Sequence, residues 1–436
     1  MIERDVYLKK LIEAKGNGFP KVITGIRRSG KSYLLSNIFS SYLLTHGVDE
    51  SSILNIDLNS ALNFDLRDPL VLSKRILSFS EGKEQVYVFI DEIQKVFTIV
   101  NPILTDGKHI LAKPKDTETI GFVDVILGLA SHKNIDIYVT GSNSKMLSSD
   151  IITEFRDKAT NIHLAPLSFY EFASYRGGSK SDALNEYMQY GGMPLAVLLD
   201  KAKKREYLKS LFQTTYFKDI LDHNHLKKSE YLDALCNILS ENIGGLINAE
   251  KISNTFQSVT HTKIAKETVE RYVEFFLDAY LISEARRFDV KGRLEIGATK
   301  KYYFTDIGLR NARLNFAFLD DGRDLENVVY NELLFRGFTI NVGALSYFDK
   351  DKAGKTVRKT GEIDFLASKG DKKYYIQVAL NMSDAQTRER EIKPYSVLND
   401  QIRKIIVVKD NIDECFDENG YTVIGACDFM LRFIAE

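Results

Sequence analysis

The sequence predicts an α/β protein whose N-terminal part contains a parallel sheet. Residues 21–24, 86–90 and 135–140 are short apolar runs, which is typical of strands buried on both faces of such a sheet. Residues 52–57 predict a further strand. Residues 32–39 follow the first strand with apolar side chains at helical spacing. A buried strand, a loop and a helix in direct succession therefore open the predicted domain.

The loop between the first strand and this helix has the pattern G-x-x-x-x-G-K-[ST], which is typical of phosphate-binding loops. A loop that leads into a helix N-terminus directs backbone N–H groups at one point, and the helix dipole favours an anion there. We therefore predict ATP and Mg²⁺ as cofactors. Lys31 is expected to reach the β- and γ-phosphates, and the Ser32 hydroxyl to ligate Mg²⁺. The predicted nucleotide-binding residues of this loop are Gly25, Ile26, Arg27, Arg28, Ser29, Gly30, Lys31, Ser32 and Tyr33.

Two acidic residues, Asp91 and Glu92, directly follow the strand at 86–90, which is the Walker B arrangement. Asp91 is expected to hold Mg²⁺, largely through water, and Glu92 to polarise the attacking water. The alternative is a pair of solvated acids at the end of a strand. The phosphate-binding loop upstream favours the catalytic interpretation.

Small polar residues follow the strand at 135–140 in the same way. Ser142 and Asn143 are candidates for contact with the γ-phosphate or the attacking water. Serine and asparagine are also common in turns that cap a following helix. Both interpretations stay open at this point.

Composition limits the class of protein. The chain has 436 residues, which is too many for one hydrophobic core, and a net charge of −1, so nucleic-acid binding would need a local basic patch. The charged N-terminus does not resemble a signal peptide, and no apolar run reaches the length of a membrane span. A cytoplasmic protein without a membrane partner is expected. Three scattered cysteines predict reduced thiols: Cys236, Cys415 and Cys427.

Four segments resemble, in this order, motifs of a prokaryotic family of AAA+-superfamily ATPases: residues 21–32, 89–94, 138–144 and 165–172. Members pair the ATPase with a C-terminal region long called a domain of unknown function. The resemblance covers nearly the whole chain and implies ATP hydrolysis, with Ser142 or Asn143 as the sensor. It also implies a helical lid, in which Pro194 approaches the adenine or the phosphates. A simple helix–helix turn is the alternative for Pro194.

The chain departs from the family pattern in two places. Members often carry an arginine finger after the sensor, which reaches a neighbouring subunit's nucleotide. Lys158 stands at that position, and a lysine cannot imitate the planar guanidinium fork. Arg156 is then the candidate finger, and an oligomer stays open. Residues 96–121 are longer than the connection needs and predict an inserted surface loop.

Residues 227–315 follow a winged-helix pattern of three helices and a two-stranded wing. Basic residues gather on the wing, and such a cluster suits DNA phosphates without reading sequence. Winged helices also dock proteins, and the third helix, at 268–276, is acidic. DNA and a protein partner both stay open. The predicted DNA-binding residues are Lys291, Arg293, Lys300 and Lys301.

The C-terminal third has the layout of the PD-(D/E)xK nuclease fold, a helix followed by two strands. Glu326 or Glu332 occupies the first acidic position, and Asp364 the second. The third position has Gln377 and Ala379, and a neutral amide is a poor Mg²⁺ ligand. We predict a vestigial nuclease site that has lost hydrolysis.

Together these patterns predict four parts, namely an AAA+-type P-loop ATPase core (1–175), a helical lid (176–226), a winged helix (227–315) and a restriction-endonuclease-like α/β domain (316–436). The predicted function is a Mg²⁺-dependent, ATP-hydrolysing molecular switch that acts on DNA or a protein partner. An ATP-gated, metal-dependent DNA endonuclease is the alternative. A module that binds nucleotide without turnover is a third, which Lys31, Asp91 and Glu92 disfavour.

Overall fold

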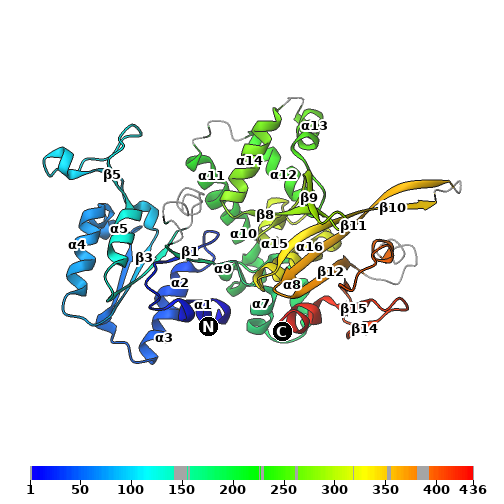
Figure 1. The fold of residues 1–436 in the computed structure, drawn as a ribbon, viewed down its shortest axis with the longest axis horizontal. Coiled ribbons are helices and arrows are strands. Elements are labelled where there is room, and N and C mark those ends of the chain that lie inside the picture. Colours follow the sequence, from blue (N-terminus) through cyan, green and yellow to red (C-terminus); the bar gives the residue numbers. More distant parts are fainter. Residues whose placement is uncertain are drawn as a thin grey trace. The chain divides into compact units, whose positions relative to one another are not determined.

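The computed structural model describes residues 2–141, 155, 158–224, 226, 230–260, 264–317, 319–350, 355–380 and 392–435. The chain forms two compact units, Met1–Ala165 and Pro166–Glu436 (Figure 1). The division into four parts stays a prediction.

The first unit is built on a five-stranded sheet in the order β2-β3-β6-β1-β7. All neighbouring strands are parallel, which confirms the predicted sheet. The edge strand β7 was not predicted, because it is short and only partly buried. The strands are β1 (Lys21–Thr24), β2 (Ile53–Asp57), β3 (Val86–Asp91), β6 (Ile135–Thr140) and β7 (Thr160–His163).

One helix of the first unit precedes β1, and the others lie between strands in the sequence. The helix predicted after the phosphate-binding loop extends from Lys31 to Thr45, with a π-helical segment at Leu34–Phe39. Asp68 caps α4, because its side chain accepts the backbone N–H groups of Leu70 and Val71. The helices are α1 (Asp5–Ala14), α2 (Lys31–Tyr33), α3 (Ser40–Thr45), α4 (Pro69–Ser80) and α5 (Phe122–Ala130).

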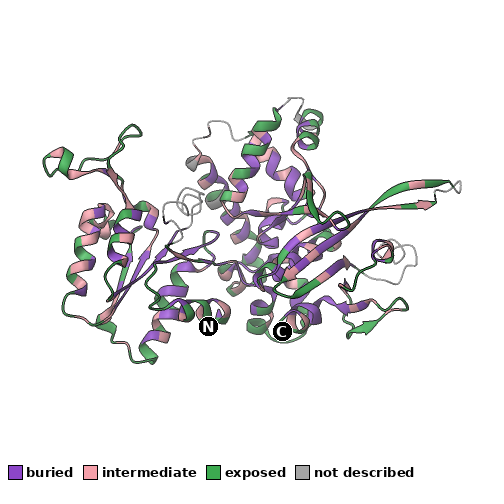
Figure 2. Cartoon of the chain, viewed as in Figure 1, coloured by how far each residue is buried: buried purple, intermediate pink, exposed green. Residues whose placement is uncertain are grey.

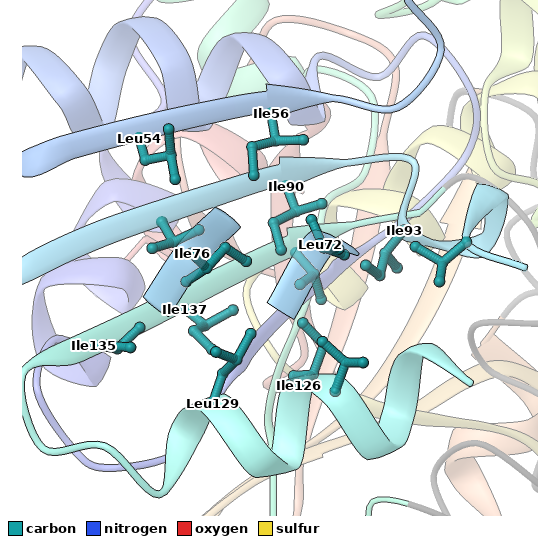
Figure 3. Packing of buried hydrophobic residues seen from close by; sticks show 14 of the residues in the cluster. Leu54, Ile56, Leu72, Ile76, Ile90, Ile93, Ile126, Leu129, Ile135 and Ile137 are labelled. Carbon is teal, nitrogen blue, oxygen red and sulfur yellow. The ribbon is translucent and has the colours of Figure 1, made fainter. Parts of the chain in front are cut away.

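The three inner strands β3, β6 and β1 are almost completely buried (Figure 2), and one face of the sheet packs against α4 and α5. Leu72 and Ile76 of α4 meet Ile90 of β3, and Ile126 of α5 joins the same cluster (Figure 3). Each such side chain stabilises the fold by roughly 1.5–3 kcal/mol when fully buried. This core fixes the carboxyl ends of β1, β3 and β6.

The segment predicted as an inserted surface loop is largely exposed. It contains β4 (Ile99–Val100), which pairs antiparallel with β5 (Thr119–Ile120). Ile103 is 86% exposed and Leu104 is 63% exposed.

The second unit contains many helices and one large sheet. The described α-helices are α7 (Phe169–Arg176), α8 (Lys180–Tyr190), α9 (Pro194–Leu198), α10 (Lys201–Leu211), α11 (Lys218–His223), α12 (Glu230–Glu241), α13 (Ala249–Thr260), α14 (Lys266–Asp278), α15 (Ile307–Arg313), α16 (Asp321–Phe335) and α18 (Ala426–Asp428). The sheet has the order β14-β15-β13-β12-β11-β10-β8-β9. Its strands are β8 (Ile282–Asp289), β9 (Leu294–Phe304), β10 (Thr339–Lys350), β11 (Thr356–Lys369), β12 (Lys372–Ala379), β13 (Arg403–Val408), β14 (Cys415–Phe416) and β15 (Thr422–Gly425).

Helices α12, α13 and α14 followed by the β8–β9 hairpin have the element order predicted for the winged helix. The hairpin is not separate from the C-terminal strands, however, because β8 pairs parallel with β10. One sheet therefore connects the predicted wing with the strands of the predicted nuclease-like domain.

Candidate nucleotide site

The phosphate-binding loop connects β1 to α2 and depends on its two glycines. Gly25 has φ 135° and Gly30 has φ 99°, a backbone region that favours glycine. A Cβ atom at Gly25 would lie 2.1 Å from the carbonyl oxygen of Leu164, so no larger residue fits there. Ile26 and Ser29 are buried in the loop, whereas Arg27, Arg28 and Tyr33 are exposed.

Gly25→Ala is expected to lower stability by roughly 1–3 kcal/mol, because it adds a clash to an unfavourable φ. ATP affinity should fall with it. Thermal unfolding and a nucleotide-binding titration check both effects. Gly128→Ala in α5 is the control, since a Cβ there meets nothing within 4 Å. A Gly25→Ala protein as stable as the wild type would contradict the described loop.

Lys31 points into the loop and is almost completely buried. Its Nζ donates to the carbonyl oxygens of Gly25 (2.9 Å) and Ile26 (3.1 Å). Burial lowers the pKa of Lys31 to about 8, although the carboxylates of Glu92 and Asp91 oppose this shift. An ammonium held in this way is well suited to exchange carbonyl oxygens for phosphate oxygens.

Ser32 and Asp91, the two predicted magnesium ligands, lie together. The Ser32 hydroxyl donates to Asp91 Oδ2 at 2.7 Å. Thr140, at the end of β6, donates to the other oxygen of the same carboxylate. Ser32, Asp57, Asp91 and Thr140 help to line a pocket of about 200 Å³.

This donor set suits Mg²⁺, which prefers a few protein oxygens and completes its shell with water and phosphate oxygens. No group of three or more His, Cys, Asp or Glu side chains is arranged to hold a metal among the residues described. The geometry therefore fits a shared magnesium site rather than a metal cage made by protein alone.

Glu92 has a left-handed backbone with φ 57°, which is uncommon for a residue other than glycine. Its N–H donates to Thr140 Oγ1 at 3.3 Å, and Gln94 Nε2 donates to its carboxylate. The backbone of the predicted catalytic acid is thus held by the neighbouring strand. The sequence patterns did not indicate Thr140 or Gln94. The hydroxyl of Thr140 follows from the sequence, but the position of its strand beside the acid pair does not.

Arg4 ties the loop to the last residues of the unit. Its guanidinium donates to the carbonyl oxygens of Ser29 (3.4 Å) and Ala165 (2.8 Å). The Leu164 N–H donates to the Thr24 carbonyl oxygen at 2.8 Å. Sequence analysis did not identify this arrangement, because it joins segments far apart in the chain.

Several predicted site residues cannot be placed at the nucleotide. Ser142, Asn143 and Arg156 lie outside the described residues. Pro194 begins α9 in the second unit, and its contact with nucleotide stays a prediction.

The second unit gathers a lysine and three carboxylates. Lys301 Nζ lies 2.9 Å from Glu326 Oε1, 2.8 Å from Glu362 Oε1 and 3.3 Å from Asp364 Oδ1. Burial alone would lower the pKa of Lys301, but the three carboxylates raise it well above its ordinary value. A buried, charged ammonium therefore lies where the carboxylates converge.

One predicted DNA contact is wrong, and only one of the two alternative helix acids, Glu326 and Glu332, lies beside Asp364. Lys301 is 2% exposed, so it cannot contact DNA from the surface of a wing. Glu332 lies away from the carboxylate cluster, because its Oε2 accepts the Phe169 N–H at 2.8 Å and its Oε1 faces Arg336. Glu326 is the helix acid that joins Asp364.

The other predicted residues of the DNA-binding site and the vestigial nuclease site make local contacts or are exposed. Gln377 Oε1 accepts the Asp364 N–H at 3.4 Å. Lys300 forms an ion pair with Glu284. Lys291 and Arg293 are exposed in the turn between β8 and β9.

Comparison with known proteins gives matches along most of the chain. Residues 17–173 match the model of the AAA domain, and residues 181–320 match a domain of unknown function, DUF8612. An uncharacterized protein of Haemophilus influenzae is 30% identical over 438 residues, covering 99% of this chain and 99% of that protein. The chain belongs to the family of that protein. In the present chain, the residues that match the AAA domain include the phosphate-binding loop, Asp91 and Glu92.

An uncharacterized protein of Methanocaldococcus jannaschii is also 30% identical to this chain, and the match covers 91% of this chain and 81% of that protein. Solved structures with distant similarity include two proteins of Aeropyrum pernix. The ORC1 protein in complex with DNA is 10% identical, with a TM-score of 0.31, over 72% of this chain and 92% of that chain. The ORC2 protein is 12% identical, with a TM-score of 0.34, over 71% and 91%. Among the helices described, none is long and apolar enough to cross a membrane.

Proposed function

We propose that this protein is a Mg²⁺-dependent ATPase that works as a molecular switch. The observation that carries the proposal is the hydrogen bond between Ser32 and Asp91, which are 59 residues apart in the sequence. This hydrogen bond brings the phosphate-binding loop next to the strand that ends in Asp91. Phosphoryl transfer requires such a loop and such a carboxylate side by side. The match to the AAA domain supports the same chemistry.

In this proposal each side chain has a separate task. Lys31 neutralises charge on the β- and γ-phosphates, and the loop N–H groups hold them in place. Ser32 and Asp91 hold Mg²⁺, which supplies further charge neutralisation at the phosphates. Glu92 accepts the proton of the attacking water. Thr140 keeps Asp91 in position by its hydrogen bond.

We further propose that nucleotide turnover in the first unit acts on DNA or a protein partner through the second. In the proposed division, residues 176–226 form the lid, 227–315 the winged helix and 316–436 a nuclease-like domain. Lys301 supports a domain without hydrolysis, because its ammonium neutralises the carboxylates that a catalytic cation would need. The neutral Gln377 and Ala379 support the same conclusion.

The decisive experiment measures ATP hydrolysis by the full chain with Mg²⁺, alone and with single- or double-stranded DNA. DNA cleavage is followed in the same tubes. We expect Mg²⁺-dependent hydrolysis and no cleavage with Mg²⁺ or Mn²⁺. Metal-dependent nicking that disappears in Asp364→Asn would instead favour the endonuclease.

Lys31→Ala is expected to weaken ATP binding by roughly 100-fold, because charged hydrogen bonds to phosphate contribute about 1.5–3 kcal/mol each. Isothermal titration with a non-hydrolysable ATP analogue measures the change. Lys74→Ala is the control, since Lys74 is an exposed lysine of α4 outside the predicted nucleotide site. Equal affinities for wild type and Lys31→Ala would place the phosphates elsewhere.

A further inference from the structure

The β10–β11 hairpin extends beyond the rest of its sheet (Figure 1). The strands on either side of the hairpin pair with it only near its base, the end away from the turn. There β8 pairs with Asn341–Ala344 and β12 with Phe365–Lys369. From Leu345 to Lys350, β10 pairs with β11 alone among the described strands. We call residues 346–350 and 356–360 the ribbon. Figure 2 shows that burial falls where the ribbon begins.

The two faces of the ribbon differ in charge. Cross-strand partners share a face, and successive residues alternate between faces. Phe348 pairs with Arg358, and Lys350 with Thr356, so these four side chains belong to one face, here called the basic face. Ser346 and Thr360 complete it, and it carries two positive charges and no acid.

On the opposite face, the acidic side chain is paired with basic side chains. Lys359 Nζ donates to Asp349 Oδ2 at 3.0 Å, and Lys393 approaches the same carboxylate at 3.7 Å. Tyr347 on this face packs against a hydrophobic cluster of the unit. Phe348 on the basic face is instead 74% exposed. Phe348 thus lies beside Lys350 and Arg358, with no acid among the ribbon residues of this face, and exposed aromatic and basic side chains together suit a binding surface.

Further basic residues lie next to the ribbon. Lys291 Nζ donates to the Ser346 carbonyl oxygen at 3.4 Å, which places the exposed β8–β9 turn at the base of the ribbon. Arg293 belongs to the same turn. The acids on this side are Asp289, which accepts the N–H groups of Lys291 and Gly292, and Glu295, which pairs with Arg286. Lys291 therefore adds a positive charge at the base of the ribbon, whereas Arg293 lies near Tyr375, on the side of the opposite face.

We propose that the basic face of the ribbon binds double-stranded DNA. A two-stranded β-ribbon fits the B-form major groove, which is about 12 Å wide. Lys350 and Arg358 neutralise backbone phosphates, and Phe348 makes an apolar contact with a base or sugar. Five residues of extended strand span roughly 17 Å, about five base pairs. A-form RNA has a deep, narrow major groove that suits a ribbon poorly.

The same face leads toward the carboxylate cluster. Glu362 follows Arg358 and Thr360 at alternate positions of β11, so it lies on the side of the basic face. Its carboxylate contacts Lys301, which reduces the negative charge that approaching DNA would meet. This inference deepens the proposed function by naming the partner. It rests on that function only for the link to ATP turnover.

The test measures binding of a fluorescein-labelled DNA duplex to the full chain by anisotropy, without nucleotide, over a range of NaCl concentrations. Lys350→Gln with Arg358→Gln should weaken binding at least tenfold and reduce the salt slope by about 2, because two phosphate contacts are lost. Phe348→Ala should weaken binding and leave the salt slope unchanged. The matched control is Lys369→Gln with Lys372→Gln, the same charge change at the exposed turn between β11 and β12.

Absence of duplex binding at low salt, or equal losses in the two double variants, would overturn the proposal. So would tighter binding of an RNA duplex of the same sequence. Lys31→Ala should bind DNA like the wild type. Loss of ATP hydrolysis with intact DNA binding would therefore count against the proposed ATPase alone. Loss of DNA binding with intact ATP hydrolysis would count against the ribbon alone.

Discussion

Glu92→Gln is expected to retain ATP binding and to lower the rate of hydrolysis by about 10²–10⁴-fold, the usual contribution of a general base. The amide keeps the shape of the side chain but cannot accept a proton from water. A steady-state phosphate-release assay beside an ATP-binding titration separates the two effects.

The matched control for this variant is Glu84→Gln, an exposed residue just before the opposite end of β3. It makes the same chemical change and should leave turnover unaltered. Hydrolysis at the wild-type rate in Glu92→Gln would mean that another group activates the water, and the role of Glu92 would have to be abandoned.

Lys301→Met is expected to destabilise the second unit by about 3–5 kcal/mol, because removing one partner of a buried ion pair leaves the other charges uncompensated. Glu326 and Asp364 would keep their carboxylates in a largely buried site. Chemical unfolding followed by circular dichroism measures the loss.

Lys300→Met is the control on the neighbouring position of β9. Lys300 is partly exposed and pairs with Glu284, so its loss should cost less than about 1 kcal/mol. A Lys301→Met protein as stable as Lys300→Met would show that the cluster contributes little to folding.

Local patterns were enough to predict the strand, loop and acidic elements that form the candidate nucleotide site of the first unit. The phosphate-binding loop and the strand before Asp91 are contiguous in the sequence, and their residue types follow directly from backbone geometry and burial. The pairing of Ser32 with Asp91 could be predicted as well, since both follow buried strands of one parallel sheet. Thr140 could not, because its role depends on β6 being the neighbour of β3.

Long-range arrangement explains the errors in the second unit. Lys300 and Lys301 are adjacent in a basic stretch, and the sequence treats them alike. On a strand they face opposite sides, so one pairs at the surface and the other is buried among acids from α16 and β11. Likewise, Glu326 and Glu332 both fit an acidic helix position, and only the packing of α16 separates them.

The contact between Gly25 and Leu164 connects the phosphate-binding loop directly to the last residues of the first unit. Leu164 is hydrogen-bonded to Thr24 just before the loop, and Arg4 joins Ser29 inside the loop to Ala165, the last residue of the unit. No spare volume separates the Gly25 backbone from the Leu164 carbonyl group. A loop that changed shape around a phosphate would therefore act first on residues 164 and 165, where the first unit ends. The phosphate-binding loop and the last residues of this unit would then respond to nucleotide together.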